Sequence, residues 1–111
     1  MPVVLENTEE KCEIGEGRTR YLAKTDNLMT AVIDFNDGPH QKADEPHQHP
    51  HEQLTYIASG ELDVFIGEEK NRLKAGDMFM VPSNVPHTVQ VLSKHARLID
   101  SFTPIREDFL K

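Results

Sequence analysis

Three imidazole side chains lie within seven residues near the middle of the chain, in the run His47-Gln48-His49-Pro50-His51-Glu52-Gln53. In an extended backbone alternate side chains share a face, so His47 and His49 can direct two ring nitrogens at one point. Because Pro50 cannot donate to a central sheet ladder, we expect the chain to turn there and to bring Gln53 back alongside on the next strand. The more distant His87 follows another apolar run and can add a further nitrogen. The pattern predicts a metal site.

A second block of residues prepares the position of the distant histidine. Gly76 supplies a turn, residues 78–81 form a short apolar run, and Asn84 lies in a Pro-x-Asn turn just before His87. Asn tolerates positive φ better than any residue except Gly, so Asn84 can re-aim the chain. The alternative is a solvated His-rich surface tract, but the spacing of the two blocks favours a metal site. Neutral imidazoles suit one divalent transition metal, which the sequence leaves open among Ni, Zn, Fe, Mn and Cu.

Short β-like runs separated by turn residues recur along the chain. The predicted strands are 18–24, 28–35, 42–49, 53–58, 61–66, 71–74, 78–81, 87–92 and 96–102. Many short strands without long helical periodicity predict an all-β sandwich or small barrel. Residues 1–17 are polar and weakly patterned, and we interpret them as an N-terminal arm. Residues 18–111 are expected to form a single domain.

Alternation along the predicted strand 53–58 separates an inner face from an outer one. Continuing from Gln53, Thr55 and Ile57 are expected to point inward, whereas Leu54 and Tyr56 point outward. An outward Leu-Tyr pair needs cover, either from the N-terminal arm or from a second chain. We therefore predict a homodimer.

The last predicted strand places a carboxylate on the inner face, where Asp100 and Phe102 alternate with outward residues. A buried carboxylate costs free energy unless it is paired or functional. Asp100 is expected either to pair with Arg106 or Lys94 as a structural clamp, or to serve as an acid/base beside the metal while Arg106 closes over an anionic substrate. Residues 103–104, Thr-Pro, are expected to cap and begin a short C-terminal helical turn.

Composition argues against several classes of function. The chain carries a formal charge of −7 at pH 7, with acidic residues spread along it, so nucleic acid is not an expected partner. It has neither a signal peptide nor a long apolar run, so we expect a cytoplasmic protein that does not enter the membrane. The remaining histidines are not expected to bind metal, since His51 lies in a turn and His40 and His95 are predicted to lie on the surface.

The two blocks resemble the paired motifs of the cupin superfamily, Gly-x5-His-x-His-x3-Glu-x6-Gly and Gly-x5-Pro-x-Gly-x2-His-x3-Asn. The matching residues are His47, His49, Gly60, Gly76, Pro82 and His87. The departures are Gln41, Gln53, Asn84 and Val91. The resemblance implies a cupin-type jelly-roll fold in which His47, His49, Gln53 and His87 hold the metal. A neutral Gln53 in place of a carboxylate leaves the metal more positive, which favours substrates that carry a carboxylate or an enolate.

A closer resemblance, to the pectin-degradation cupins of the KdgF type, rests on the run His-x-His-Pro-His-Glu-Gln together with the C-terminal Asp-x-Phe-Thr-Pro-x-Arg-Glu-Asp-Phe. It implies that a small anionic sugar is the substrate, and that 4,5-unsaturated uronates from pectin or alginate breakdown are opened and converted to linear keto uronates. Asp100 and Arg106 would be catalytic, and Phe102 and Arg106 would bind substrate. Two alternatives stay open: a metal-dependent cupin dioxygenase acting on an enolisable small molecule, and a non-catalytic metal- or sugar-binding cupin.

Overall fold

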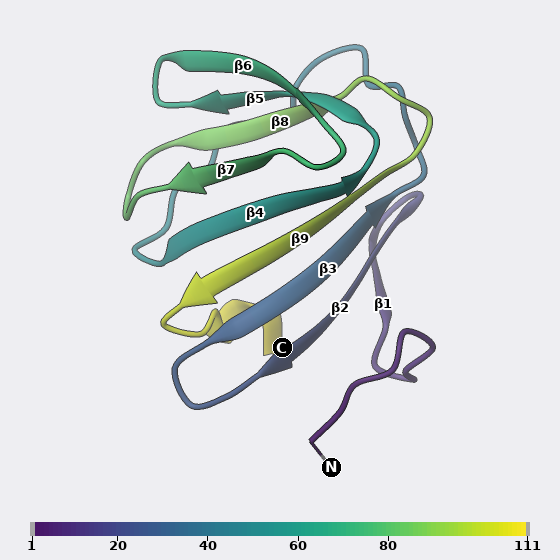
Figure 1. The fold of residues 1–111 in the computed structure, drawn as a ribbon, viewed down its shortest axis with the longest axis vertical. Helices are drawn as coiled ribbons and strands as arrows, with labels where there is room; N and C mark the ends of the chain where they lie inside the picture. Colours follow the sequence, from purple (N-terminus) through teal and green to yellow (C-terminus); the bar gives the residue numbers. More distant parts are fainter. Residues whose placement is uncertain (1, 111) are drawn as a thin grey trace.

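A computed structural model describes residues 2–110 as two antiparallel sheets with one short helical turn (Figure 1). The elements are β1 (Cys12–Gly15), β2 (Arg18–Lys24), β3 (Met29–Phe35), β4 (Glu52–Ser59), β5 (Glu61–Ile66), β6 (Glu69–Lys74), β7 (Met78–Val81), β8 (His87–Val91), β9 (Ala96–Thr103) and η1 (Glu107–Leu110). The larger sheet has the order β1-β2-β3-β9-β4-β7 and the smaller has the order β6-β5-β8. The all-β jelly-roll sandwich predicted from the sequence is confirmed.

The main core lies between the two sheets, because alternate residues of the facing strands are apolar and point inward. Its buried members are Phe35, Ile57, Leu62, Val64, Phe79, Val81, Val91, Ala96 and Leu98. A smaller apolar cluster is formed on β3 and β9 of the larger sheet by Met29, Ala31 and Phe102, and Phe109 of η1 packs against it. The inner face predicted for β4 is confirmed, since Gln53, Thr55 and Ile57 are buried while Leu54 and Tyr56 are exposed.

Two turn residues predicted from the sequence have the conformations their roles require. Asn84 has φ of 62° in the loop that leads into β8, which confirms the turn expected there. Gly60 has φ of 94°, and a Cβ at this position would lie 2.6 Å from the backbone oxygen of His95. Only Gly fits the tight β4–β5 connection, so this turn fixes where β5 enters the smaller sheet.

The predicted strand over residues 42–49 is wrong. Residues 36–51 form a long loop between β3 and β4, in which His47 makes one isolated bridge to His87 through backbone hydrogen bonds of 3.0 and 2.9 Å. Pro46 and Pro50 flank this bridge, and neither has an N–H to extend a ladder. The backbone bridge between His47 and His87 thus connects the loop to β8.

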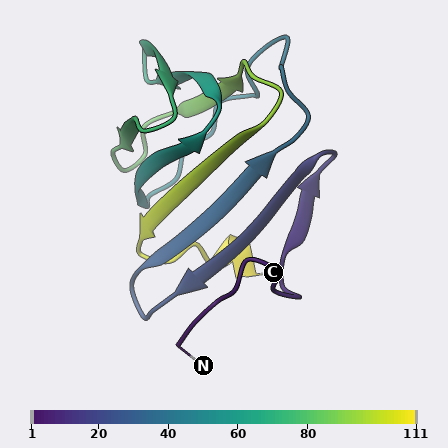
Figure 2. The same ribbon diagram turned by 45° about the vertical axis from the view of Figure 1, so that its right-hand side comes forward.

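The two ends of the chain also differ in part from the expectation. Cys12–Gly15, within the predicted arm, forms the edge strand β1 and pairs with β2. Thr103 does not cap a helix, because it is the last residue of β9 and still pairs with Glu52. The predicted helical turn is present as η1 and lies beside β2 and β3 in both views (Figures 1 and 2). Within residues 2–110, no helix is long and apolar enough to cross a membrane.

Candidate functional site

The loop before β4 and the start of β8 bring three histidines together. The ligand nitrogens of His47, His49 and His87 all lie within 4.8 Å of one another. The ring centroids of His47 and His87 are 4.3 Å apart, and those of His49 and His87 are 4.9 Å apart. The structure therefore confirms that the two separate sequence blocks converge on one cluster of imidazoles.

Backbone carbonyls orient two of the three rings. His49 Nδ1 donates to the His51 carbonyl at 3.0 Å, and His87 Nδ1 donates to the Val85 carbonyl at 2.9 Å. In a neutral imidazole with a protonated Nδ1, the other nitrogen carries a lone pair. The Nε2 atoms of both rings are thus presented as acceptors. His87 Nε2 is buried and has no hydrogen-bond partner among the described residues.

The electrostatics of the cluster disfavour protonation of the rings. Burial, followed by the charges of His87 and His49, lowers the pKa of His47 to about 4, although its outer edge is exposed at the rim. Burial is also the largest cause of the lowered pKa values of His49 and His87. Neutral nitrogens that converge on one point and lack a proton between them fit a divalent transition metal. The unpartnered Nε2 of His87 is a buried polar atom that such an ion would satisfy.

A chain of buried polar contacts connects this cluster to the acidic residue on β9. The Oε1 atom of Gln53 lies 3.1 Å from His49 Nε2, and its Nε2 atom donates to Thr55 Oγ1 at 2.9 Å. Thr55 Oγ1 in turn donates to Asp100 Oδ1 at 2.6 Å. Gln53 and Thr55 follow alternately along β4, and Thr55 is directly opposite Asp100 on β9. The strand pairing thus places the predicted acid next to the predicted ligand.

A cavity of about 250 Å³ opens beside the cluster. Its lining includes six of the predicted site residues, namely His47, Gln53, His87, Asp100, Phe102 and Arg106. The volume is just below the ~300–1,000 Å³ that is common for pockets holding drug-sized ligands. The cavity therefore suits a small molecule.

Asp100 lines this cavity and is buried. Burial raises the pKa of Asp100 to about 6, while the hydrogen bond from Thr55 and the charge of Arg106 act in the opposite direction. The structural clamp considered from the sequence is wrong, because within residues 2–110 Asp100 forms no ion pair and Arg106 pairs instead with Asp108 at 2.6 Å. A buried carboxyl with a pKa near neutrality can accept and return a proton.

The C-terminal turn covers one side of the cavity with aromatic and cationic side chains. The Phe109 ring lies under the guanidinium of Arg106 at 4.2 Å and that of Arg20 at 3.9 Å, and it meets Phe102 edge to face. Cation–π contacts of this kind hold both arginines beside the cavity. The positive charge of Arg106 also contributes to the lowered pKa values of His47 and His49.

Several residues of the site were missed or misplaced by sequence reasoning. Arg20 lines the cavity, and alternation along β2 from Arg18 is the signal that could have found it. His40 is not a surface residue: its ring is largely buried, receives the Val91 N–H and lies 3.2 Å from Asp37. The reason is that the 36–51 loop folds back over β8.

The other two histidines stand as the sequence predicts. His95 is exposed and hydrogen-bonded to Asn36. His51 lies outside the cluster, and its Nε2 donates to the Ile105 carbonyl at 3.1 Å. His51 therefore anchors the C-terminal segment near the cavity.

Comparison with known proteins agrees with this fold. The cupin domain family profile matches residues 35–102, which contain all of the clustered histidines. The pectin degradation protein KdgF of Dickeya dadantii is 38% identical over 100 residues, covering 88% of each chain.

Solved structures give the same result. An RmlC-like cupin from Shewanella frigidimarina has a TM-score of 0.84 at 34% identity, covering 96% of this chain and 93% of that one. KdgF from Halomonas has a TM-score of 0.83 at 31% identity, covering 95% of this chain and 94% of that one. On its fold, its two motifs and these relatives, the chain belongs to the cupin superfamily and is similar to the pectin-degradation protein KdgF.

Proposed function

We propose that the chain is a metal-dependent isomerase that opens 4,5-unsaturated uronate monosaccharides and converts them to linear keto uronates. The observation that carries this proposal is the buried Asp100 carboxyl, with a pKa of about 6, in one small cavity with the histidine cluster and Arg106. The similarity to KdgF proteins, whose name refers to pectin degradation, supports uronates from pectin or alginate as the substrate class.

Asp100 is assigned the proton transfers. Its carboxylate removes the proton from the anomeric hydroxyl, so the C1–O5 bond breaks as the C1 carbonyl forms, and the electron pair passes into an enolate at C5 and C4. Asp100 then returns a proton to C4, and the C5 ketone forms. The reaction is an isomerisation in which atoms and electrons balance without an oxidant. A positioned acid/base contributes roughly 10²- to 10⁴-fold to such a rate.

Arg106 and Phe102 are assigned to substrate binding. The Arg106 guanidinium is mostly shielded from solvent and is oriented by Asp108 and the Phe109 ring. A guanidinium held in this way can pair with a carboxylate through two hydrogen bonds. Phe102 is buried on the inner face next to Asp100 and offers a flat apolar wall to the sugar ring.

His47, His49, His87 and Gln53 are proposed as the metal ligands. A divalent transition metal bound there would act as a Lewis acid toward substrate oxygens. The Gln53 carboxamide is neutral, so the four side chains cancel none of the charge of a divalent ion. Attraction for an anionic substrate is thereby kept high. The identity of the metal is left to elemental analysis of protein purified without added metal.

The direct test is an assay on 4,5-unsaturated galacturonate and its alginate-derived counterpart. We expect the protein to accelerate loss of the alkene absorbance without consuming oxygen. A spontaneous rate for both uronates, or oxygen uptake that matches turnover, would contradict the proposal. The second result would favour a dioxygenase.

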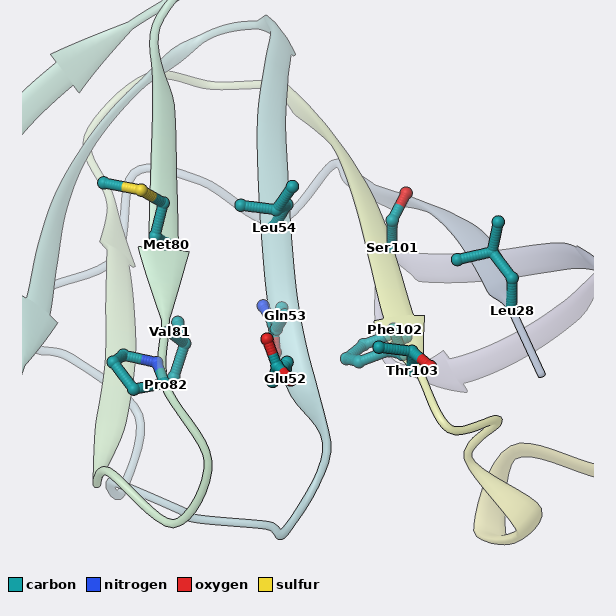
Figure 3. A pocket seen from close by; sticks show the side chains of 10 residues that line it. All are labelled: Leu28, Glu52, Gln53, Leu54, Met80, Val81, Pro82, Ser101, Phe102 and Thr103. Atoms are coloured by element: carbon teal, nitrogen blue, oxygen red, sulfur yellow. The ribbon is translucent and has the colours of Figure 1, made fainter.

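We further propose that the chain forms a homodimer through the outer face of β4 and β7. Figure 3 shows Leu54 between Met80 and Ser101, beside a surface groove of about 380 Å³. Four outward residues of the two strands are large, mainly apolar and exposed, namely Leu54, Tyr56, Met78 and Met80, while Glu52 adds one exposed carboxylate at the edge of the groove. An apolar surface matches these four side chains, and the arm of a second copy offers one, since its exposed Val3–Leu5 segment is apolar. Sedimentation analysis should find a dimer; a monomer at all concentrations would contradict this proposal.

A further inference from the structure

The chain of polar contacts from His49 to Asp100 has both of its ends fixed. At one end, the His51 carbonyl can only accept, so His49 Nδ1 carries the proton and Nε2 of the neutral ring carries a lone pair. At the other end, the Asp100 carboxylate accepts the hydroxyl proton of Thr55 across 2.6 Å. The donors His49 Nδ1 and Thr55 Oγ1 are therefore both assigned, and the orientation of Gln53 between them follows.

The single hydroxyl proton of Thr55 determines how the Gln53 carboxamide is oriented. Because that proton is given to Asp100, the Thr55 oxygen must accept, and it accepts from Gln53 Nε2 at 2.9 Å. The carboxamide oxygen is then turned toward His49 Nε2, 3.1 Å away. Two lone-pair atoms thus face each other in a buried place, where they repel unless a cation lies between them.

We propose that Thr55 is a positioning residue that holds the Gln53 oxygen toward the metal and ties its orientation to the carboxylate of Asp100. The inference rests on the proposed function in taking Gln53 as a ligand. Thr55 is fully buried and meets the ligand only through Gln53, so it acts through another residue and does not touch substrate or metal. Partners that orient a metal ligand in this way account for about 10- to 100-fold in metal affinity.

Thr55→Val and Thr55→Ser separate the hydroxyl from the shape of the side chain. Val is nearly the same size as Thr but can neither accept from Gln53 nor donate to Asp100, whereas Ser retains both hydrogen bonds. In a Ni²⁺ titration against a chromogenic chelator, we expect Thr55→Val to bind about 10- to 100-fold more weakly and Thr55→Ser to be close to wild type. Circular dichroism establishes that each variant is folded.

Two further variants test whether the effect passes through Gln53. In a Gln53→Ala background, Thr55→Val should cause no additional loss of Ni²⁺ affinity, because the group that Thr55 orients is gone. Thr30→Val is the matched control, since the Thr30 hydroxyl also makes a cross-strand hydrogen bond, to Ser101, but on the outer face of the same sheet. It should leave Ni²⁺ affinity unchanged.

A measurement on metal-free protein keeps the inference separate from the proposed function. The Gln53 side-chain N–H held by Thr55 should exchange slowly with solvent in NMR spectra of the wild type, and faster in Thr55→Val. Wild-type Ni²⁺ affinity in Thr55→Val, or an equal loss in the Gln53→Ala background, would overturn the positioning role. If the wild type binds no metal, the proposed function fails, and the exchange rates alone decide whether Thr55 orients Gln53.

Discussion

Over residues 53–56, the two faces of β4 are opposite in character to those of an ordinary half-buried strand. On the inner face Gln53 and Thr55 are polar and only 8% and 0% exposed, whereas on the outer face Leu54 and Tyr56 are 56% and 43% exposed. A strand with one solvated face normally buries its apolar residues and exposes its polar ones. The inversion places hydrogen-bonded chemistry inside and an uncovered apolar surface outside.

The difference shows that each face is suited to a different partner. Inside, the Gln53 side-chain N–H and the Thr55 hydroxyl are hydrogen-bonded along the chain that ends at Asp100, which offsets part of the cost of burial. Outside, the apolar side chains lie over a groove with no cover within residues 2–110. Variants of the inner face should change metal binding and catalysis, and variants of the outer face should change association.

The largest effect is expected from removing one histidine of the cluster. His87→Ala takes away the buried Nε2 atom that has no other partner, so the purified protein should contain no bound metal by elemental analysis. His51→Ala is the control, because its backbone carbonyl still receives the His49 Nδ1 proton. Full metal occupancy in His87→Ala would contradict the assignment of the histidine cluster as the metal site.

Asp100→Asn should cost roughly 10²- to 10⁴-fold in turnover, because it removes the acid/base and keeps the shape. The Asn oxygen still accepts from Thr55, so metal content should match the wild type. Turnover within a few-fold of wild type would show that the proton moves through another group.

Stability of the metal-free protein should depend on pH through the same residue. The pKa of Asp100 is raised from 3.8 to about 6, so its favourable contribution to folding is complete below pH 3.8 and is lost as pH rises through 6. At pH 8 the free energy of unfolding of Asp100→Asn, measured by denaturant titration, should therefore exceed that of the wild type by up to about 3 kcal/mol. Near pH 4 the two free energies should be similar. A constant difference across this range would contradict a buried carboxyl with a raised pKa.

Met80→Lys introduces a charge on the β7 side of the outer groove, where Met80 is 70% exposed. Burying a lysine in an apolar interface is costly, so the dimer should dissociate to monomer in sedimentation experiments. Metal content should be unchanged, because Met80 points away from the histidines. Loss of metal together with association would show that the two faces are not independent.

The smallest effect is expected for Gln53→Glu. The new carboxylate neutralises part of the metal charge, so metal affinity should hold or rise while the KM for an anionic uronate increases. Steady-state kinetics at saturating metal measure the change. An unaltered KM and turnover would mean that the neutral side chain of Gln53 is incidental.

Much of the inner face could be predicted from sequence, because strand alternation and motif spacing are local properties. His47, His49 and His87 were brought together by two short patterns, and Asp100 by parity along one strand. The strand predicted over 42–49 was wrong because Pro46 and Pro50 flank the only bridge that this segment makes among the described residues, and neither has an N–H to extend the pairing. The burial of His40 could not be predicted from histidine spacing either, because it depends on the tertiary contact between the 36–51 loop and β8.

The contacts between distant elements could not be predicted. The contact of Arg20 on β2 with the Phe109 ring of η1 joins elements far apart in the sequence. The Thr55–Asp100 hydrogen bond depends on the register of β4 against β9, which no single strand pattern specifies. The reactive side chains could thus be identified from the sequence, whereas the hydrogen bonds between them depend on strand register.

The fate of solvent deuterium at C4 of the product tests the central claim most directly. When the protein acts on 4,5-unsaturated galacturonate in D₂O, proton return from the fixed Asp100 should place one deuterium on a single face of C4, so NMR should show one diastereomer formed faster than in buffer alone. Both diastereomers in equal amounts, formed at the spontaneous rate, would contradict the claim that the inner face of β4 and β9 is a catalytic site.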